Sequence, residues 1–154
     1  GYIGCEFACI LNGLGVEVTQ VIRGDRILRG FDEDIRTEIQ HGMSNHGIKL
    51  LKNIQMIAIE KNDHGVTVSL GTGDTTEVVV ADAVSLAAVG RKPNTQNLGL
   101  EHTKVKTHKG VIEVNAYSQT AEEHIYAVGD CTDRMNLTPV AINEGRAFAD
   151  TVFG

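Results

Sequence analysis

Three arginines near the amino end of the chain could bind a phosphate group. Arg23, Arg26 and Arg29 follow a β-branched, apolar run at 16–22, which predicts a buried strand. In a dinucleotide-binding fold, the end of the second strand meets the cofactor ribose: an acid there suits NAD, whereas positive charge suits the 2′-phosphate of NADP. This stretch ends in Ile22 and Arg23, with no terminal acid. It therefore favours NADPH, and the alternative is a solvated basic loop.

The first residues predict a phosphate-binding turn. Gly1 and Gly4 match the last two glycines of G-x-G-x-x-G, in which backbone N–H groups at a helix N-terminus reach a dinucleotide pyrophosphate. A helical pattern and then a strand pattern follow, as that motif requires. The competing interpretation is a tight loop before a helix. The half-motif also predicts that the chain is an interior fragment whose first strand lies before Gly1.

Two further positions could face a cofactor. Asp130 ends the segment Tyr-Ala-Val-Gly-Asp, which predicts a carboxylate at the carboxyl edge of a sheet, where ligands of open α/β sheets bind. An ordinary turn aspartate is the alternative. Thr138 and Pro139 predict a helix start, with Thr138 as the N-cap, whose partial positive charge could stabilise an electron-rich group. Most such helix starts bind only water.

The cysteines and histidines predict neither a metal site nor a local redox pair. Cys5 and Cys9 lie one helical turn apart, but no ligand histidine stands nearby, so we expect both to be small buried apolar residues. Cys131 leaves an odd total without a C-x-x-C pair, which fits a reducing compartment. The six histidines are scattered without metal-ligand spacing.

Apolar periodicity predicts the elements that position these residues. A helix over 3–14 presents a stripe of Ile3, Phe7, Ile10, Leu11 and Leu14, and Gly13 and Gly15 end it. The remaining elements expected before residue 90 are a helix at 32–46, a buried strand at 48–51, an antiparallel meander at 55–60, 66–70 and 75–80, and a buried strand at 83–89.

A change to Arg, Lys, Pro, Asn and Gly over 91–99 predicts a domain boundary. Beyond it we expect strands at 111–114 and 125–128 and a helix from Thr138 to about 149. The whole pattern predicts an α/β protein: a three-layer, Rossmann-like domain with a parallel sheet and a meander, followed by part of a second domain.

Composition excludes several classes of partner. The 154 residues carry a formal net charge of −6 with a pI near 5.4, so nucleic acid and anionic membranes are not expected partners. No apolar run is long enough to span a bilayer, and no signal peptide is recognisable. These features predict a cytoplasmic protein.

The motifs together resemble the glutathione reductase branch of the pyridine nucleotide-disulfide oxidoreductases, over nearly the whole chain. The residues that carry the resemblance are Gly-Tyr-Ile-Gly-Cys-Glu at 1–6, Ile-Arg at 22–23, Leu-Arg-Gly-Phe-Asp at 28–32, Val-Gly-Arg-Lys-Pro-Asn at 89–94, Tyr-Ala-Val-Gly-Asp at 126–130 and Asn-Leu-Thr-Pro-Val-Ala at 136–141. The segments 28–32, 91–100 and 132–146 resemble the family members found in photosynthetic organisms, which leaves a plastid location open.

The resemblance implies two domains and a set of cofactor-binding residues. Residues 1–93 would be the NADPH-binding domain, and 94–154 the returning part of the FAD-binding domain. Tyr2 would be a lid over the nicotinamide site, Glu6 a carboxylate facing the flavin, and Arg23 and Arg29 the 2′-phosphate clamp. The remaining cofactor-binding residues implied are Gly1, Ile3, Gly4, Gly90 and Arg91 for NADPH, and Asp130, Leu137 and Thr138 for FAD.

The activity implied is hydride transfer from NADPH to FAD, and then reduction of a redox disulfide and of glutathione disulfide, in a homodimer. The redox cysteines and the acid-base histidine of that family would lie outside residues 1–154, so no catalytic residue is expected within the chain. Two alternatives stay open. One is another NADPH-dependent member, such as a trypanothione or mercuric reductase, and the other is a nucleotide-binding module without catalytic activity.

Overall fold

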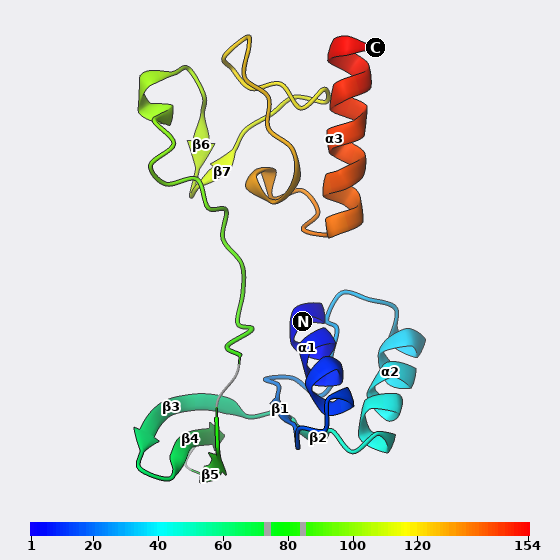
Figure 1. The fold of residues 1–154 in the computed structure, drawn as a ribbon, viewed down its shortest axis with the longest axis vertical. Helices are drawn as coiled ribbons and strands as arrows, with labels where there is room; N and C mark the ends of the chain where they lie inside the picture. Colours follow the sequence, from blue (N-terminus) through cyan, green and yellow to red (C-terminus); the bar gives the residue numbers. More distant parts are fainter. Residues whose placement is uncertain (73–74, 84–85) are drawn as a thin grey trace. The chain divides into compact units, whose positions relative to one another are not determined.

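The computed structural model describes residues 1–72, 75–83 and 86–154, and the chain folds into two compact units, Gly1–Val89 and Gly90–Gly154 (Figure 1). The sequence places the boundary later, after residue 93. No described helix is long and apolar enough to cross a membrane.

The first unit contains a βαβ arrangement. Helix α1 (Tyr2–Gly13) leads to β1 (Thr19–Val21), and α2 (Glu33–Asn45) connects β1 to β2 (Lys49–Leu51). The two strands pair in parallel, with Thr19 opposite Lys49 and Val21 opposite Leu51. Both helices and both strands were predicted, but β1 is shorter than 16–22, because its only described partner strand has three residues to pair with.

Helix α2 begins where the sequence predicts. The Asp32 side chain caps it, since its Oδ1 accepts from the backbone N–H groups of Asp34 at 3.0 Å and Ile35 at 3.3 Å. Glu33 and Asp34 place negative charge in the first turn, where the helix dipole favours it.

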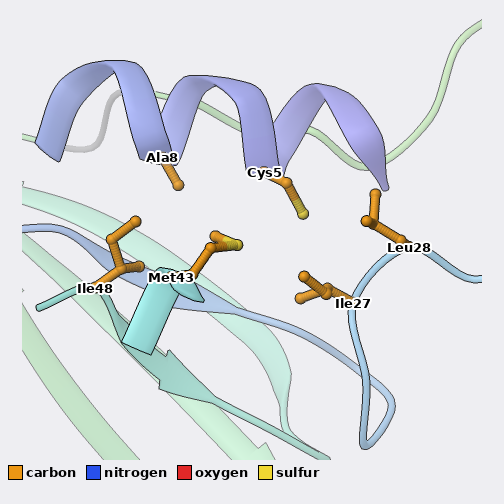
Figure 2. Close-up of a cluster of buried hydrophobic side chains, with 6 residues drawn as sticks. All are labelled: Cys5, Ala8, Ile27, Leu28, Met43 and Ile48. Atoms are coloured by element: carbon orange, nitrogen blue, oxygen red, sulfur yellow. The ribbon is translucent and has the colours of Figure 1, made fainter. Parts of the chain in front are cut away.

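The core of this unit lies between the two helices and the loop that connects β1 to α2 (Figure 2). Its buried side chains are Cys5 and Ala8 of α1, Ile27 and Leu28 of the loop, Met43 of α2, and Ile48. We call this set the core cluster. The face predicted for α1 is wrong in part: Phe7, Ile10 and Leu14 are exposed, Ile3 and Leu11 are half-buried, and the small side chains of Cys5 and Ala8 face the core. Small residues there allow α1 to approach the loop and Met43 closely.

The predicted antiparallel meander is confirmed. Strands β3 (Gln55–Asn62), β4 (Gly65–Thr72) and β5 (Thr75–Ala81) pair in sequence order. Gly65 begins β4 directly after the turn of the first hairpin, with a φ of +131°. A Cβ there would lie 2.4 Å from the Ala81 carbonyl oxygen, so only glycine fits. Leu70 of β4 is completely buried.

The strand predicted at 83–89 is wrong over the described residues of that run. Residues 84 and 85 lie outside the described part, and 83 and 86–89 belong to no strand. An apolar run becomes a strand only beside another strand, and no described strand pairs with 86–89. The Val89 N–H instead bonds to the Ala87 carbonyl at 2.9 Å, which is a local turn.

The second unit has little regular sheet. Short helix η1 (Leu100–His102) precedes β6 (Thr107–His108) and β7 (Val111–Ile112), which pair antiparallel, so the strand predicted at 111–114 is shorter than expected. The strand predicted at 125–128 is wrong: Tyr126 makes a single bridge to Gln119, and no described strand continues the pairing.

The unit ends with η2 (Gly129–Thr132) and α3 (Thr138–Phe153). Phe148 of α3 packs on Tyr126, with ring centroids 5.0 Å apart. The prediction that Thr138 is the N-cap is wrong, because the Leu137 carbonyl already accepts the Ala141 N–H at 3.0 Å. Leu137 is the N-cap, and α3 starts at Thr138.

Candidate functional site

The loop between β1 and α2 carries the three arginines and is anchored through its middle. Ile27 and Leu28 are inserted into the core cluster, and Leu28 holds a left-handed φ of +52°. Arg23, Arg26 and Arg29 stand on either side of this anchor, and all three are exposed. The loop therefore presents its charges outward from a fixed attachment point.

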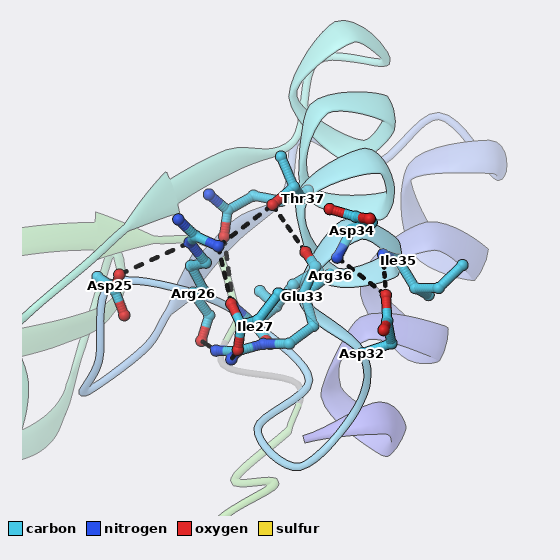
Figure 3. A network of polar contacts seen from close by, with 10 residues as sticks. Asp25, Arg26, Ile27, Asp32, Glu33, Asp34, Ile35, Arg36 and Thr37 are labelled. Carbon is cyan, nitrogen blue, oxygen red and sulfur yellow. Dashed lines mark hydrogen bonds and ion pairs between the residues drawn. The ribbon is translucent and has the colours of Figure 1, made fainter.

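The structure separates the arginines into two kinds. Arg26 is paired: its Nη1 lies 2.8 Å from Glu33 Oε2 and 3.3 Å from Thr37 Oγ1, and its Nε lies 3.7 Å from Asp25 Oδ2 (Figure 3). Arg23 and Arg29 have no ion pair with any carboxylate in the part of the chain that the structure describes. On a chain of charge −6, these two guanidinium groups are the charges of the loop that could bind an anion.

The start of α1 lies close to β1, as a dinucleotide turn requires. A Cβ at Gly4 would lie 3.3 Å from Gln20 Nε2 and 3.5 Å from Ala88 Cβ, so glycine permits the close packing of helix on strand. Gly1 precedes the helix, and no side chain caps it. Tyr2 is half-buried and packs against the core cluster, Ile3 is half-buried, and Glu6 is exposed. The core cluster thus connects Tyr2 with the arginine loop.

The cysteines form neither a disulfide nor a metal site. Cys5 is buried, as expected, and Gln20 Nε2 lies 3.7 Å from its Sγ. Burial raises the pKa of the Cys5 thiol, because desolvation disfavours the thiolate. Cys9 is exposed, so the expectation that it is buried is wrong; it points away from the small-residue face of α1. Among the described residues, no group of His, Cys, Asp and Glu could hold a metal ion.

In the second unit, Asp130 forms an ion pair that the sequence did not reveal. Its Oδ2 accepts from Arg91 Nε at 3.1 Å and from Arg91 Nη2 at 2.8 Å. Both groups are partly exposed. With Oδ2 occupied twice, Oδ1 is the carboxylate oxygen left to accept a hydrogen bond from a ligand. Gly90, just before Arg91, has a φ of +152° that suits glycine.

The turn that carries Asp130 is held from α3. Gly129 has a φ of +73°, and its N–H donates to Glu144 Oε2 at 2.6 Å. Glu144 Oε1 lies 3.2 Å from Arg134 Nη2, which also donates to Ser118 Oγ at 3.1 Å. Glu144 and Arg134 were not predicted from the sequence, because no motif marks a pair whose partners are settled by the packing of α3.

The start of α3 offers free donors. Helix geometry leaves the N–H groups of Thr138 and Val140 without an intrahelical acceptor, and Pro139 has no N–H. No side chain caps this helix start. The Leu137 N–H, by contrast, bonds to the Met135 carbonyl at 2.9 Å. Thr138 and Val140 are therefore the donors available to an electron-rich ligand atom.

Known proteins resemble this chain along its whole length. The family model described as pyridine nucleotide-disulphide oxidoreductase matches residues 1–145. The chain is 55% identical to a glutathione reductase of Nostoc over the whole chain and 36% of the relative, and 42% identical to a trypanothione reductase of Trypanosoma congolense, of which it covers 32%. The solved HOCl-induced flavoprotein disulfide reductase RclA from Escherichia coli superposes with a TM-score of 0.83 at 27% identity, over the whole chain and 34% of that protein. The chain thus spans about a third of the length of the curated relatives it matches.

Proposed function

Because the chain belongs to the pyridine nucleotide-disulphide oxidoreductase family, we propose that it forms the NADPH-binding domain (residues 1–93) and part of the FAD-binding domain (94–154) of a reductase that acts on glutathione disulfide. The observation that carries the cofactor assignment is the state of the arginines at the end of β1. Arg23 and Arg29 have no ion pair with any described residue, whereas Arg26 is paired with Glu33. A doubly charged 2′-phosphate supplies the partner that Arg23 and Arg29 lack.

The residues present also fit the pyrophosphate of NADPH. The uncapped start of α1 at Gly1 presents N–H groups, and Gly4 permits the close packing on β1 that such turns need. Tyr2, which packs on the core cluster, is the proposed lid over the nicotinamide site, and Ile3 and Glu6 of the same helix belong to the proposed set. Gly90 and Arg91 complete the proposed set for NADPH.

The second unit fits a flavin. Asp130 Oδ1 can accept a hydrogen bond from a ribitol hydroxyl while Arg91 holds Oδ2. The backbone at Leu137 and Thr138 would border the flavin ring. The free N–H groups of Thr138 and Val140 and the positive end of the α3 dipole would face its oxygen and nitrogen atoms. FAD held by Asp130, Leu137 and Thr138 would supply the redox chemistry that couples oxidation of NADPH to reduction of a disulfide.

Glutathione disulfide is the proposed substrate, because the Nostoc relative at 55% identity is a glutathione reductase. Another NADPH-dependent member of the family is the second candidate, which the trypanothione reductase at 42% identity favours. A nucleotide-binding module without catalysis is the third. We further propose a homodimer in the cytoplasm, with a plastid as the alternative location.

The test of this function uses the protein expressed from its complete reading frame. We expect bound flavin in the absorbance spectrum and NADPH oxidation that depends on glutathione disulfide, with much slower oxidation in the presence of trypanothione disulfide or Hg(II). NADH should be a poor reductant. Faster oxidation with another acceptor would show that this acceptor, and not glutathione disulfide, is the substrate. Bound nucleotide without any acceptor-dependent oxidation of NADPH would favour the non-catalytic module.

Asp130→Asn should weaken FAD binding by about five- to tenfold. The substitution turns a charge-assisted hydrogen bond into a neutral one, a difference of about 1 kcal/mol, and it removes the ion pair with Arg91. Asp133→Asn is the matched control, since it removes the same charge three residues away, at a left-handed position that asparagine tolerates. The measurement is the dissociation constant of FAD for the apoprotein of each variant, obtained from flavin fluorescence. Equal effects of the two substitutions would contradict a role for Asp130 in FAD binding.

A further inference from the structure

Helix α2 presents four polar side chains to the arginine loop. Glu33, Arg36, Thr37 and Gln40 have the spacing of one helix face, and each takes part in a hydrogen bond to the loop. Figure 3 shows Glu33, Arg36 and Thr37 beside the loop. We call these residues the polar strip of α2. None of them belongs to the motifs that predict cofactor binding.

Arg36 makes the most contacts in the polar strip. Its Nε donates to the Ile27 carbonyl at 2.8 Å, its Nη2 donates to the Arg26 carbonyl at 3.4 Å, and its Nη1 pairs with Glu33. The side chain is only 12% exposed. Because each of its three nitrogens is engaged within the protein and little of the side chain reaches solvent, Arg36 is a support for the loop and not a ligand-binding group.

The loop backbone is fixed on two sides at the same place. The Ile27 side chain is buried in the core cluster, while its carbonyl bonds to Arg36 and its N–H to Gln40 Oε1 at 3.3 Å. Arg23 and Arg29 flank this fixed point and have no described ion-pair partner of their own. The anchor at 26–27 therefore determines where the two free guanidinium groups stand.

We propose that Arg36 is a positioning residue for nucleotide selectivity: it holds the loop backbone so that Arg23 and Arg29 engage a 2′-phosphate together. The inference rests on the proposed NADPH site and adds to it a residue of α2 that does not itself touch the nucleotide. Lysine cannot replace Arg36, because a single ammonium group cannot span two backbone carbonyls and a carboxylate in a planar fork.

The test compares two ligands that differ only in the 2′-phosphate. Dissociation constants of 2′,5′-ADP and 5′-AMP are measured by calorimetry on the protein from its complete reading frame, so no turnover is needed. Arg36→Lys keeps the net charge and should lower the preference for 2′,5′-ADP by about tenfold, with 5′-AMP unchanged. Gln40→Ala should lower it by a smaller factor. Arg146→Lys, at an exposed position on α3, is the control and should leave both constants unchanged.

A second background separates positioning from direct binding. If Arg36 acts through Arg23 and Arg29, then Arg36→Lys should have no further effect on the preference once both are glutamine. Full additivity of Arg36→Lys with that double substitution would overturn the proposal, as would an unchanged preference in both Arg36→Lys and Gln40→Ala. Equal weakening of 2′,5′-ADP and 5′-AMP would also overturn it, since that is the result of a purely structural role. The proposed NADPH site fails separately, if the Arg23 and Arg29 double substitution itself leaves the preference unchanged.

Discussion

Replacing both Arg23 and Arg29 by glutamine should weaken NADP⁺ binding by about 10²- to 10⁴-fold and leave NAD⁺ binding nearly unchanged. Each charge-assisted contact with the 2′-phosphate contributes about 1.5 to 3 kcal/mol, and about 1.4 kcal/mol corresponds to a factor of ten. Because both side chains are exposed, the effect should shrink toward the lower end as salt concentration rises. Dissociation constants at two ionic strengths measure both features.

Arg26→Gln is the matched control for that experiment. It removes the same charge from the same loop, but Arg26 is already paired with Glu33, and exposed ion pairs contribute only about 0 to 1 kcal/mol. We expect NADP⁺ binding to change by less than about fivefold. Equal losses of affinity for NADP⁺ and NAD⁺ in the Arg23 and Arg29 double variant would show that these arginines stabilise the domain and do not bind the 2′-phosphate.

Ile27→Ala should destabilise the first unit by about 2 to 5 kcal/mol. The Ile27 side chain is 2% exposed in the core cluster, and its truncation removes apolar contacts and leaves a cavity between α1, the loop and α2. Ile27→Val removes one methyl group and should cost about 0.5 to 1.5 kcal/mol. Urea denaturation of the protein from its complete reading frame, without nucleotide, gives these differences.

Ile57→Ala is the control for burial in that series. Ile57 is 63% exposed on β3, so its truncation should change stability by about 0.5 kcal/mol or less. If Ile27→Ala and Ile57→Ala had the same effect, Ile27 would not anchor the loop in the core. Where the Ile27→Ala protein remains folded, 2′,5′-ADP should also bind more weakly, because one of the two attachments of the loop is lost.

The sequence by itself determined the elements whose signals are local. Asp32 with two acids after it marks the start of α2, and the alternating runs around Gly65 mark the meander, because caps, turns and periodicity depend on neighbours a few residues away. The motifs at 1–6, 89–94 and 126–130 likewise identified the family, whose model matches residues 1–145. These features need no knowledge of what packs on them.

The extent of the strands could not be predicted in the same way. The runs at 16–22, 83–89 and 125–128 have the composition of strands, but a strand requires a hydrogen-bonding partner along its length. Thr19–Val21 has such a partner in β2, whereas Tyr126 makes one bridge only. The exposed side of α1 was misread for a related reason, since the face that is buried depends on the elements opposite and not on the apolar stripe alone.

Only the tertiary structure decided which charges are free to bind a ligand. By residue type and spacing Arg23, Arg26 and Arg29 look equivalent, and only the family resemblance singled out Arg23 and Arg29. In the structure, the packing of α2 brings Glu33 to Arg26 and leaves the other two without a described ion pair. Asp130 gains Arg91 from 39 residues away, and Gly129 gains Glu144 from 15 residues away. Residue type determines what a side chain can bind, whereas the partner it meets depends on how distant segments pack, and no local pattern encodes that distance.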